Sequence, residues 1–110
     1  MNVEFTNAYL ERTLMRNLFE TVKNNVPLNE YVLKNIDAEI KAIGTRMLRV
    51  SPCPLCGHRD CYTIYETNQT YYCFSCEATG DVIHLEKHLH RLPSNYEAAQ
   101  SLAARYLGGK

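Results

Sequence analysis

The sequence lacks both the long apolar run of a membrane span and the basic-then-apolar start of a secretion signal. Residues 1–7 carry no basic region and no apolar core. We therefore expect a protein that stays in the cytoplasm and does not enter a membrane. In that compartment the five cysteines are more readily explained as metal ligands than as disulfides.

The sequence also lacks net charge, because twelve Lys and Arg residues balance twelve Asp and Glu residues. This balance is not that of a strong, non-specific phosphate binder. Any nucleic-acid role has to rest on a local patch, on base stacking or on a partner protein. The 110 residues, 45% of them hydrophobic, predict one globular domain, with or without a helical extension.

Two Cys-x-x-Cys pairs dominate the chain: Cys53 and Cys56, then Cys73 and Cys76. Each pair forms a tight turn that points two thiolates at one metal, and a hairpin between the pairs returns the second turn to the first. This spacing predicts one structural Zn²⁺ ion held by all four cysteines. Four thiolates leave no open coordination position, so such a zinc holds the fold and does not activate water. Two disulfides, or free buried thiols, are the alternative.

Other candidate ligands lie nearby. Cys61 reads as a small buried hydrophobe or a reactive thiol, and His58 as a side chain outside the ligand set. His84 and His88 have a spacing of four residues that can bind zinc on a helix, but no third ligand is in evident reach. We interpret their segment as a solvated helix face, with Lys87 as a candidate phosphate contact.

Two apolar stripes precede the cysteines. Residues 8–25 predict an amphipathic helix capped by Asn7, and residues 28–44 predict a second helix that Gly44 ends. The second stripe repeats mostly in steps of four: Leu28, Val32, Ile36, Ile40 and Ile43. The stripes are either core or the interface with a partner, including a second copy of the chain.

The remaining segments predict a small antiparallel sheet followed by helices. The expected strands are residues 46–50, 62–65 and 70–73, with a turn at 66–69. Asp81 is a good N-cap for a helix from residue 82 to about 90, and Ser94 for one from 95 to 106.

Three motifs together resemble a known family, the zinc-binding domain of bacterial, phage and plasmid DNA primases. The motifs are Cys53-Pro54-Leu55-Cys56-Gly57, Tyr71-Tyr72-Cys73-Phe74-Ser75-Cys76 and Gly80-Asp81-Val82-Ile83. The resemblance covers residues 45–110 well and 10–44 more loosely. It implies an α+β fold, a zinc-ribbon sheet flanked by helices, with a helical segment at 1–44 and the zinc-binding domain at 45–110.

Two departures from the family pattern matter. Cys56 stands where bacterial chromosomal primases usually have histidine, although phage-type relatives use four cysteines, and zinc accepts either ligand. The catalytic primase domain has no counterpart, and the sequence contains no Asp-x-Asp pair. We therefore expect no catalysis by this chain alone, and a role in assisting a primase supplied by another polypeptide or by a further part of a longer one.

The resemblance implies contact with single-stranded DNA template. Exposed rings can stack on bases and arginines can meet phosphates, which selects six candidates: Arg46, Arg49, Arg59, Tyr65, Tyr72 and Lys87. A primase, a helicase or another replication protein is the implied partner, and a mobile element is one expected setting. A zinc-scaffolded protein-interaction or regulatory module and a redox or metal-sensing switch are the alternative functions.

Overall fold

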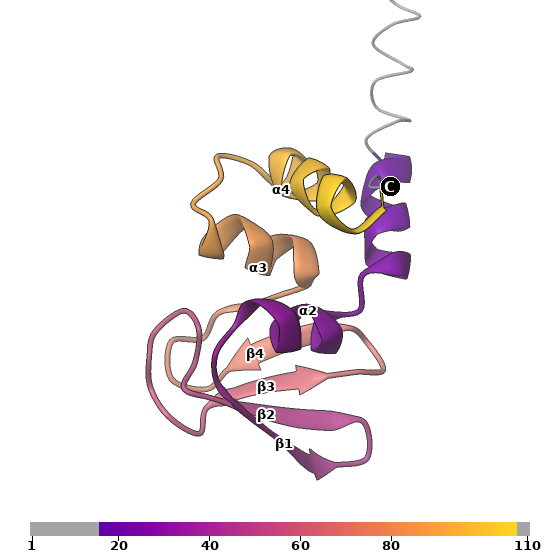
Figure 1. The fold of residues 1–110 in the computed structure, drawn as a ribbon. Helices are drawn as coiled ribbons and strands as arrows, with labels where there is room; N and C mark the ends of the chain where they lie inside the picture. Colours follow the sequence, from indigo (N-terminus) through magenta and orange to yellow (C-terminus); the bar gives the residue numbers. More distant parts are fainter. Residues whose placement is uncertain (1–15, 108–110) are drawn as a thin grey trace, which may run out of the picture.

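The computed structural model describes residues 16–107 and shows an α+β fold (Figure 1). A helical stretch at 16–25 and α2 precede a five-stranded antiparallel sheet, and two helices and a π-helical segment follow it. The strands run in sequence order across the sheet: β1 (Glu39–Gly44), β2 (Met47–Ser51), β3 (Tyr62–Tyr65), β4 (Thr70–Cys73) and β5 (Thr79–Gly80). The helical elements are α2 (Leu28–Asn35), α3 (Val82–Leu89), α4 (Asn95–Leu102) and the π-helix η1 (Ala103–Leu107). The predicted fold class is confirmed. In the described range no helix has the length and apolarity to cross a membrane.

The central hairpin agrees with its prediction. β3 and β4 pair antiparallel from Tyr62 opposite Cys73 to Tyr65 opposite Thr70. The turn between them is fixed to α2, because the side-chain oxygen of Gln69 accepts a hydrogen bond from the Leu28 amide at 2.6 Å. The hairpin therefore holds its two ends, and with them Cys73, at a fixed place on the sheet.

Both predicted caps form. The Asp81 carboxylate accepts the amide hydrogen of His84 at 3.0 Å, and the Ser94 hydroxyl accepts that of Glu97 at 3.2 Å. The second of these helices stops being α-helical at Leu102 and continues as η1. The predicted first helix is observed over residues 16–25, while its predicted N-cap Asn7 and residues 8–15 lie outside the described range.

The predicted helix over residues 28–44 is wrong beyond Asn35. Ile36 is already extended, with φ −128° and ψ 129°, and residues 39–44 form β1. A step of four residues is ambiguous, because positions i and i+4 share a face in a helix and in a strand. β2 supplies a pairing edge, with Ile40 opposite Val50, and tertiary pairing outweighs the helical pattern. The predicted domain division at residue 44 falls at the β1–β2 turn and stays a prediction.

One face of the sheet carries the core. Opposed residues share a face, so the register places Val50, Tyr62, Ile64 and Tyr71 together, and all four are buried. The rings of Tyr62 and Tyr71 stack with centroids 5.0 Å apart. The core also includes the stripe residues Val22, Leu28 and Val32, while Leu18, Phe19, Ile36 and Ile40 are partly buried against it. Ile43, at the end of the second stripe, is 42% exposed. The buried stripe residues are therefore core, and they are not available to a partner.

Candidate metal centre and nucleic-acid interface

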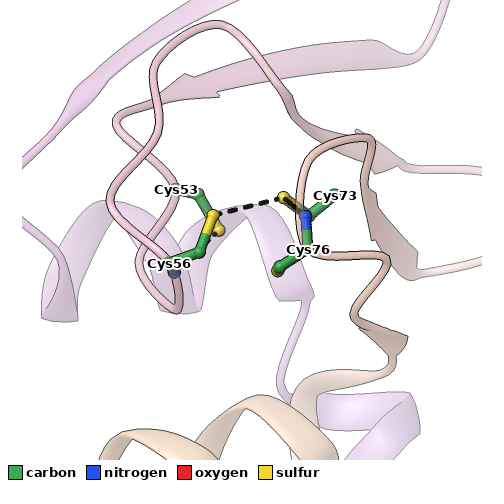
Figure 2. Close-up of side chains that lie close together, drawn as sticks. All are labelled: Cys53, Cys56, Cys73 and Cys76. Carbon is green, nitrogen blue, oxygen red and sulfur yellow. Dashed lines mark hydrogen bonds between the residues drawn. The ribbon is translucent and has the colours of Figure 1, made fainter.

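The structure brings the four predicted zinc ligands together. The Sγ atoms of Cys53, Cys56, Cys73 and Cys76 all lie within 4.8 Å of one another. One pair comes from the loop after β2 and the other from the turn after β4, and the two face each other in Figure 2. Cys53 and Cys73 are buried, Cys56 is half-buried and Cys76 is exposed.

The two Cys-x-x-Cys turns have the same geometry. In the first, the amides of Leu55 and Cys56 donate to Cys53 Sγ at 3.3 and 3.4 Å. In the second, the amides of Ser75 and Cys76 donate to Cys73 Sγ at 3.4 and 3.3 Å. Each turn therefore aims two N–H dipoles at the sulfur of its first cysteine, which stabilises a thiolate there.

The thiol pKa values reflect burial and these hydrogen bonds. Burial raises the pKa of Cys53 to about 12, despite the two amides that it accepts. Burial also acts to raise the pKa of Cys73, but the amides of Cys76 and Ser75 and its thiol neighbours overcome this and lower it to about 6. The pKa of Cys56 is lowered, first by a backbone hydrogen bond involving His58. The cluster is thus partly prepared for a cation, and a divalent metal supplies the charge that ionises the rest.

The sulfur positions fit zinc. Zn–S bonds of about 2.3 Å in a tetrahedron place neighbouring sulfurs about 3.8 Å apart, and Cys56 Sγ and Cys73 Sγ are 3.7 Å apart. All five cysteines are free thiols, which agrees with a metal site rather than the alternative of two disulfides. The four cysteines form a zinc-binding site, and zinc bound there would tie the loop after β2 to the turn after β4.

Cys61 is buried and touches this cluster without joining it. Its Sγ lies 3.5 Å from Cys73 Sγ and also donates to the carbonyl oxygen of His58 at 3.4 Å. The same carbonyl accepts the Cys53 amide at 2.7 Å, and the His58 side chain is exposed. His58 therefore contributes through its backbone. Cys61 is buried, as its interpretation as a small hydrophobe expects, and its reactivity as a thiol stays a prediction.

The histidines of α3 make other contacts. His84 Nδ1 lies 3.0 Å from Asp81 Oδ1, and His90 Nε2 lies 3.5 Å from the carboxylate of Glu86. Among residues 16–107 the four cysteines are the one group of three or more side chains placed to hold a metal. The predicted solvated face of α3 is wrong at Glu86, which is fully buried.

The sheet face opposite the core gathers three of the predicted nucleic-acid residues. Successive strand pairing puts five residues in one row across the sheet: Lys41, Arg49, Thr63, Tyr72 and Thr79. Arg49 is held in place, because it donates to the Thr63 hydroxyl at 3.1 Å and to the Asp60 carbonyl at 2.9 Å. Tyr65, opposite Met47, lies in the next row of the same face. Lys41 and Thr79 at the two ends of the row are exposed, Arg49 and Tyr72 are half-buried, and Thr63 between them is buried. We call this surface the open face because it lies opposite the core.

The other three candidates lie elsewhere. Arg46 is exposed in the β1–β2 turn and donates to the Thr67 hydroxyl at 3.0 Å. Arg59 is exposed between the first cysteine pair and β3, and its guanidinium lies 3.6 Å from the Glu39 carboxylate. Lys87 is on α3, which is not part of the sheet.

Sequence reasoning left two residues of this surface out of the candidate set. Lys41 was left out because residues 28–44 were wrongly predicted to be a helix. The polar-apolar alternation from Glu39 to Ala42 was the signal that could have placed it in a strand. Phe74 follows β4 directly, is 61% exposed, and meets Tyr72 edge to face with centroids 4.8 Å apart. Its position two residues after Tyr72 was the signal for that shared face.

Comparison with known proteins supports the fold and the metal site. No curated protein matches the chain. Among solved structures, the chain is similar to the Aquifex aeolicus primase, in a crystal structure of its zinc-binding and RNA polymerase domains. The two share 22% sequence identity with a TM-score of 0.67, over 81% of this chain and 21% of the other. A family model described as the CHC2 zinc finger, of the DnaG-type zinc ribbon, matches residues 14–108. With its four-cysteine centre and five-stranded sheet, the chain belongs to this family of primase zinc fingers.

Proposed function

We propose that the chain is a primase-type zinc module that binds single-stranded DNA on the open face and performs no catalysis itself. The observation that supports this best is the row of Lys41, Arg49 and Tyr72 with Phe74 beside it. Basic groups attract phosphates, and exposed rings accept unpaired bases by stacking. A local patch of this kind serves a chain whose net charge is zero.

The zinc site supports the open face mechanically. Phe74 sits between ligand Cys73 and the rest of the second Cys-x-x-Cys turn, and its amide donates to the Cys61 carbonyl at 2.8 Å. When zinc is bound it fixes this turn, so the Phe74 ring stays next to Tyr72. Zinc in this proposal has a structural role and organises the surface that meets the bases.

The direct test is binding of fluorescein-labelled oligothymidine to the zinc-loaded chain, measured by anisotropy at low and at physiological salt. Tyr72→Ala and Phe74→Ala each weaken binding roughly 5- to 150-fold, as expected for about 1–3 kcal/mol per stacked base. Lys41→Ala makes the plot of log affinity against log salt shallower, by about 0.7 in slope for each phosphate that the lysine neutralises.

A matched control comes from another face. Tyr96 on α4 is 37% exposed, so Tyr96→Ala removes a ring without touching the sheet and leaves binding unchanged. Equal effects of Tyr96→Ala and Phe74→Ala, or no binding by the zinc-loaded chain at low salt, would exclude the open face as the site.

We further propose that primer synthesis is carried out by another polypeptide or domain, to which this module presents the template. The related Aquifex chain contains zinc-binding and RNA polymerase domains, and this chain corresponds to 21% of it. A primase or helicase encoded beside this protein is the partner to test, by co-purification and by primer synthesis with and without the chain. Stimulation by the wild type and not by Tyr72→Ala supports the proposal; equal stimulation by both contradicts it.

A further inference from the structure

Cys61 is the one cysteine of the chain outside the four-sulfur cluster. Its contact with the cluster is set by the backbone. Tyr62 pairs with Cys73, and the Cys61 carbonyl accepts the Phe74 amide, so the chain brings the two cysteines side by side. The resulting Sγ–Sγ distance to Cys73 is 3.5 Å, shorter than the 3.7 Å between Cys56 and Cys73.

The four-cysteine cluster already supplies a complete tetrahedral ligand set for zinc. When zinc is bound, the Cys61 thiol therefore stays uncoordinated beside a coordinated Cys73 thiolate. A free thiol in this position can react with an oxidised ligand without first leaving the metal, whereas each of the four ligands would have to give up a Zn–S bond.

We propose that Cys61 and Cys73 form a redox modification site, in which a peroxide joins the two sulfurs as a disulfide and zinc is released. The peroxide O–O bond breaks as one oxygen is transferred to one sulfur of the pair, giving a sulfenic acid. The second sulfur attacks the first, an S–S bond forms and the S–O bond breaks. Two electrons pass from the two sulfurs to the peroxide. One proton comes from the Cys61 thiol and one from solvent, so the peroxide leaves as two molecules of water.

Loss of Cys73 from the metal explains the release. Three remaining sulfurs bind zinc more weakly than four, and Cys73 is the member of the cluster that connects it to β4. The inference goes beyond template binding and does not depend on it, because the disulfide and the free zinc are measured directly.

The experiment treats the zinc-loaded full chain with hydrogen peroxide. Released zinc is followed with a chromogenic chelator, and disulfides are mapped by alkylation, proteolysis and mass spectrometry. We expect zinc release together with a Cys61–Cys73 cross-linked peptide, both reversed by dithiothreitol and added zinc. Cys61→Ser and Cys61→Ala, which bind zinc one to one before oxidation, should release it at least severalfold more slowly.

Two results would overturn the proposal. One is release from the Cys61 variants at the wild-type rate. The other is a wild-type disulfide map confined to Cys53–Cys56 and Cys73–Cys76. The second result is obtained on the wild type alone, so it decides the question even if the buried substitution impairs folding.

Discussion

Gly57 and Glu77 occupy equivalent positions, each directly after the second cysteine of its turn. Both have left-handed backbones, with φ of 82° and 65°. Their amides donate to the carbonyls of Cys53 and Cys73 at 2.9 and 2.8 Å, which closes the two turns in the same way. Glycine adopts this conformation without a steric penalty, whereas glutamate incurs one.

Substituting these two residues should therefore change the free energy of unfolding in opposite directions. A Cβ on Gly57 would meet no atom within 4 Å, so Gly57→Ala tests backbone strain alone and should destabilise the zinc-loaded protein by about 1–2 kcal/mol. Glu77→Gly relieves the same strain and should be neutral or stabilising by up to about 1 kcal/mol. Urea denaturation with zinc present measures both. A stabilising Gly57→Ala would show that the first turn does not need the left-handed conformation.

Predictability from sequence differs from residue to residue. The four zinc ligands could be predicted from the sequence, because two Cys-x-x-Cys pairs separated by a hairpin are typical of a structural zinc site. The Cys61–Cys73 contact could not be predicted, because it depends on the register at the end of the β3–β4 ladder, which spacing alone does not define. Cys56, which the resemblance places where bacterial chromosomal primases usually have histidine, has its sulfur in the cluster.

At the scale of elements, one buried carboxylate connects four helical segments. Glu86 on α3 is fully buried and accepts hydrogen bonds from three side chains, on α2, α4 and η1: Tyr31, Ser101 and Arg105. Each of these bonds is 2.5 Å long. The charge in the core is thus satisfied by donors from its neighbours, which is the condition for burying it.

Removing one of the three donors should lower the stability of the protein. Arg105 is the cationic partner of Glu86, with its side chain 39% exposed, and it also donates to the Asn35 side-chain oxygen at 3.2 Å. Arg105→Ala should destabilise the protein by about 1–2 kcal/mol, a value reduced for solvent screening, while exposed Arg91→Ala should have little effect. Glu86→Gln combined with Arg105→Ala should cost less than the sum of the single changes in urea denaturation. Strict additivity would mean that the pair does not interact.

The strands show why some elements were predictable and one was not. The β-branched and aromatic residues on both sides of a polar turn predict β3 and β4, so local sequence and tertiary pairing agree. In residues 36–44 the local sequence is ambiguous, because an apolar step of four residues fits both a helix and a strand, and pairing with β2 selects the strand. The buried Glu86 is a similar case, since a charged residue amid His84, Lys87 and His88 reads as surface until its partners from other helices are known.

At the scale of the whole molecule, the metal site is continuous with the core. Cys53 and Cys73 belong to the buried cluster, and zinc bound by the four cysteines would add bonds between the loop after β2 and the turn after β4. A chain of this size has little core to spare, so binding energy at the metal adds directly to the free energy of unfolding. Chelation of zinc should lower that free energy.

The protonation of the thiols determines how this contribution depends on pH. Zinc binds thiolates, so binding displaces a proton from every thiol that is protonated in the metal-free protein. At neutral pH the protonated thiols include Cys53, with its pKa raised to about 12, and Cys76, whose pKa is also raised by burial. Cys73, with a pKa of about 6, is then mostly a thiolate and releases little proton. Zinc affinity should therefore increase with pH above neutrality by roughly a hundredfold or more per pH unit, as expected for about two displaced protons. It should decrease more steeply below pH 6, where Cys73 also binds a proton.

Competition with a chromogenic chelator across this range, with thermal unfolding recorded in parallel, measures both trends. A zinc affinity independent of pH would contradict binding by these four thiolates.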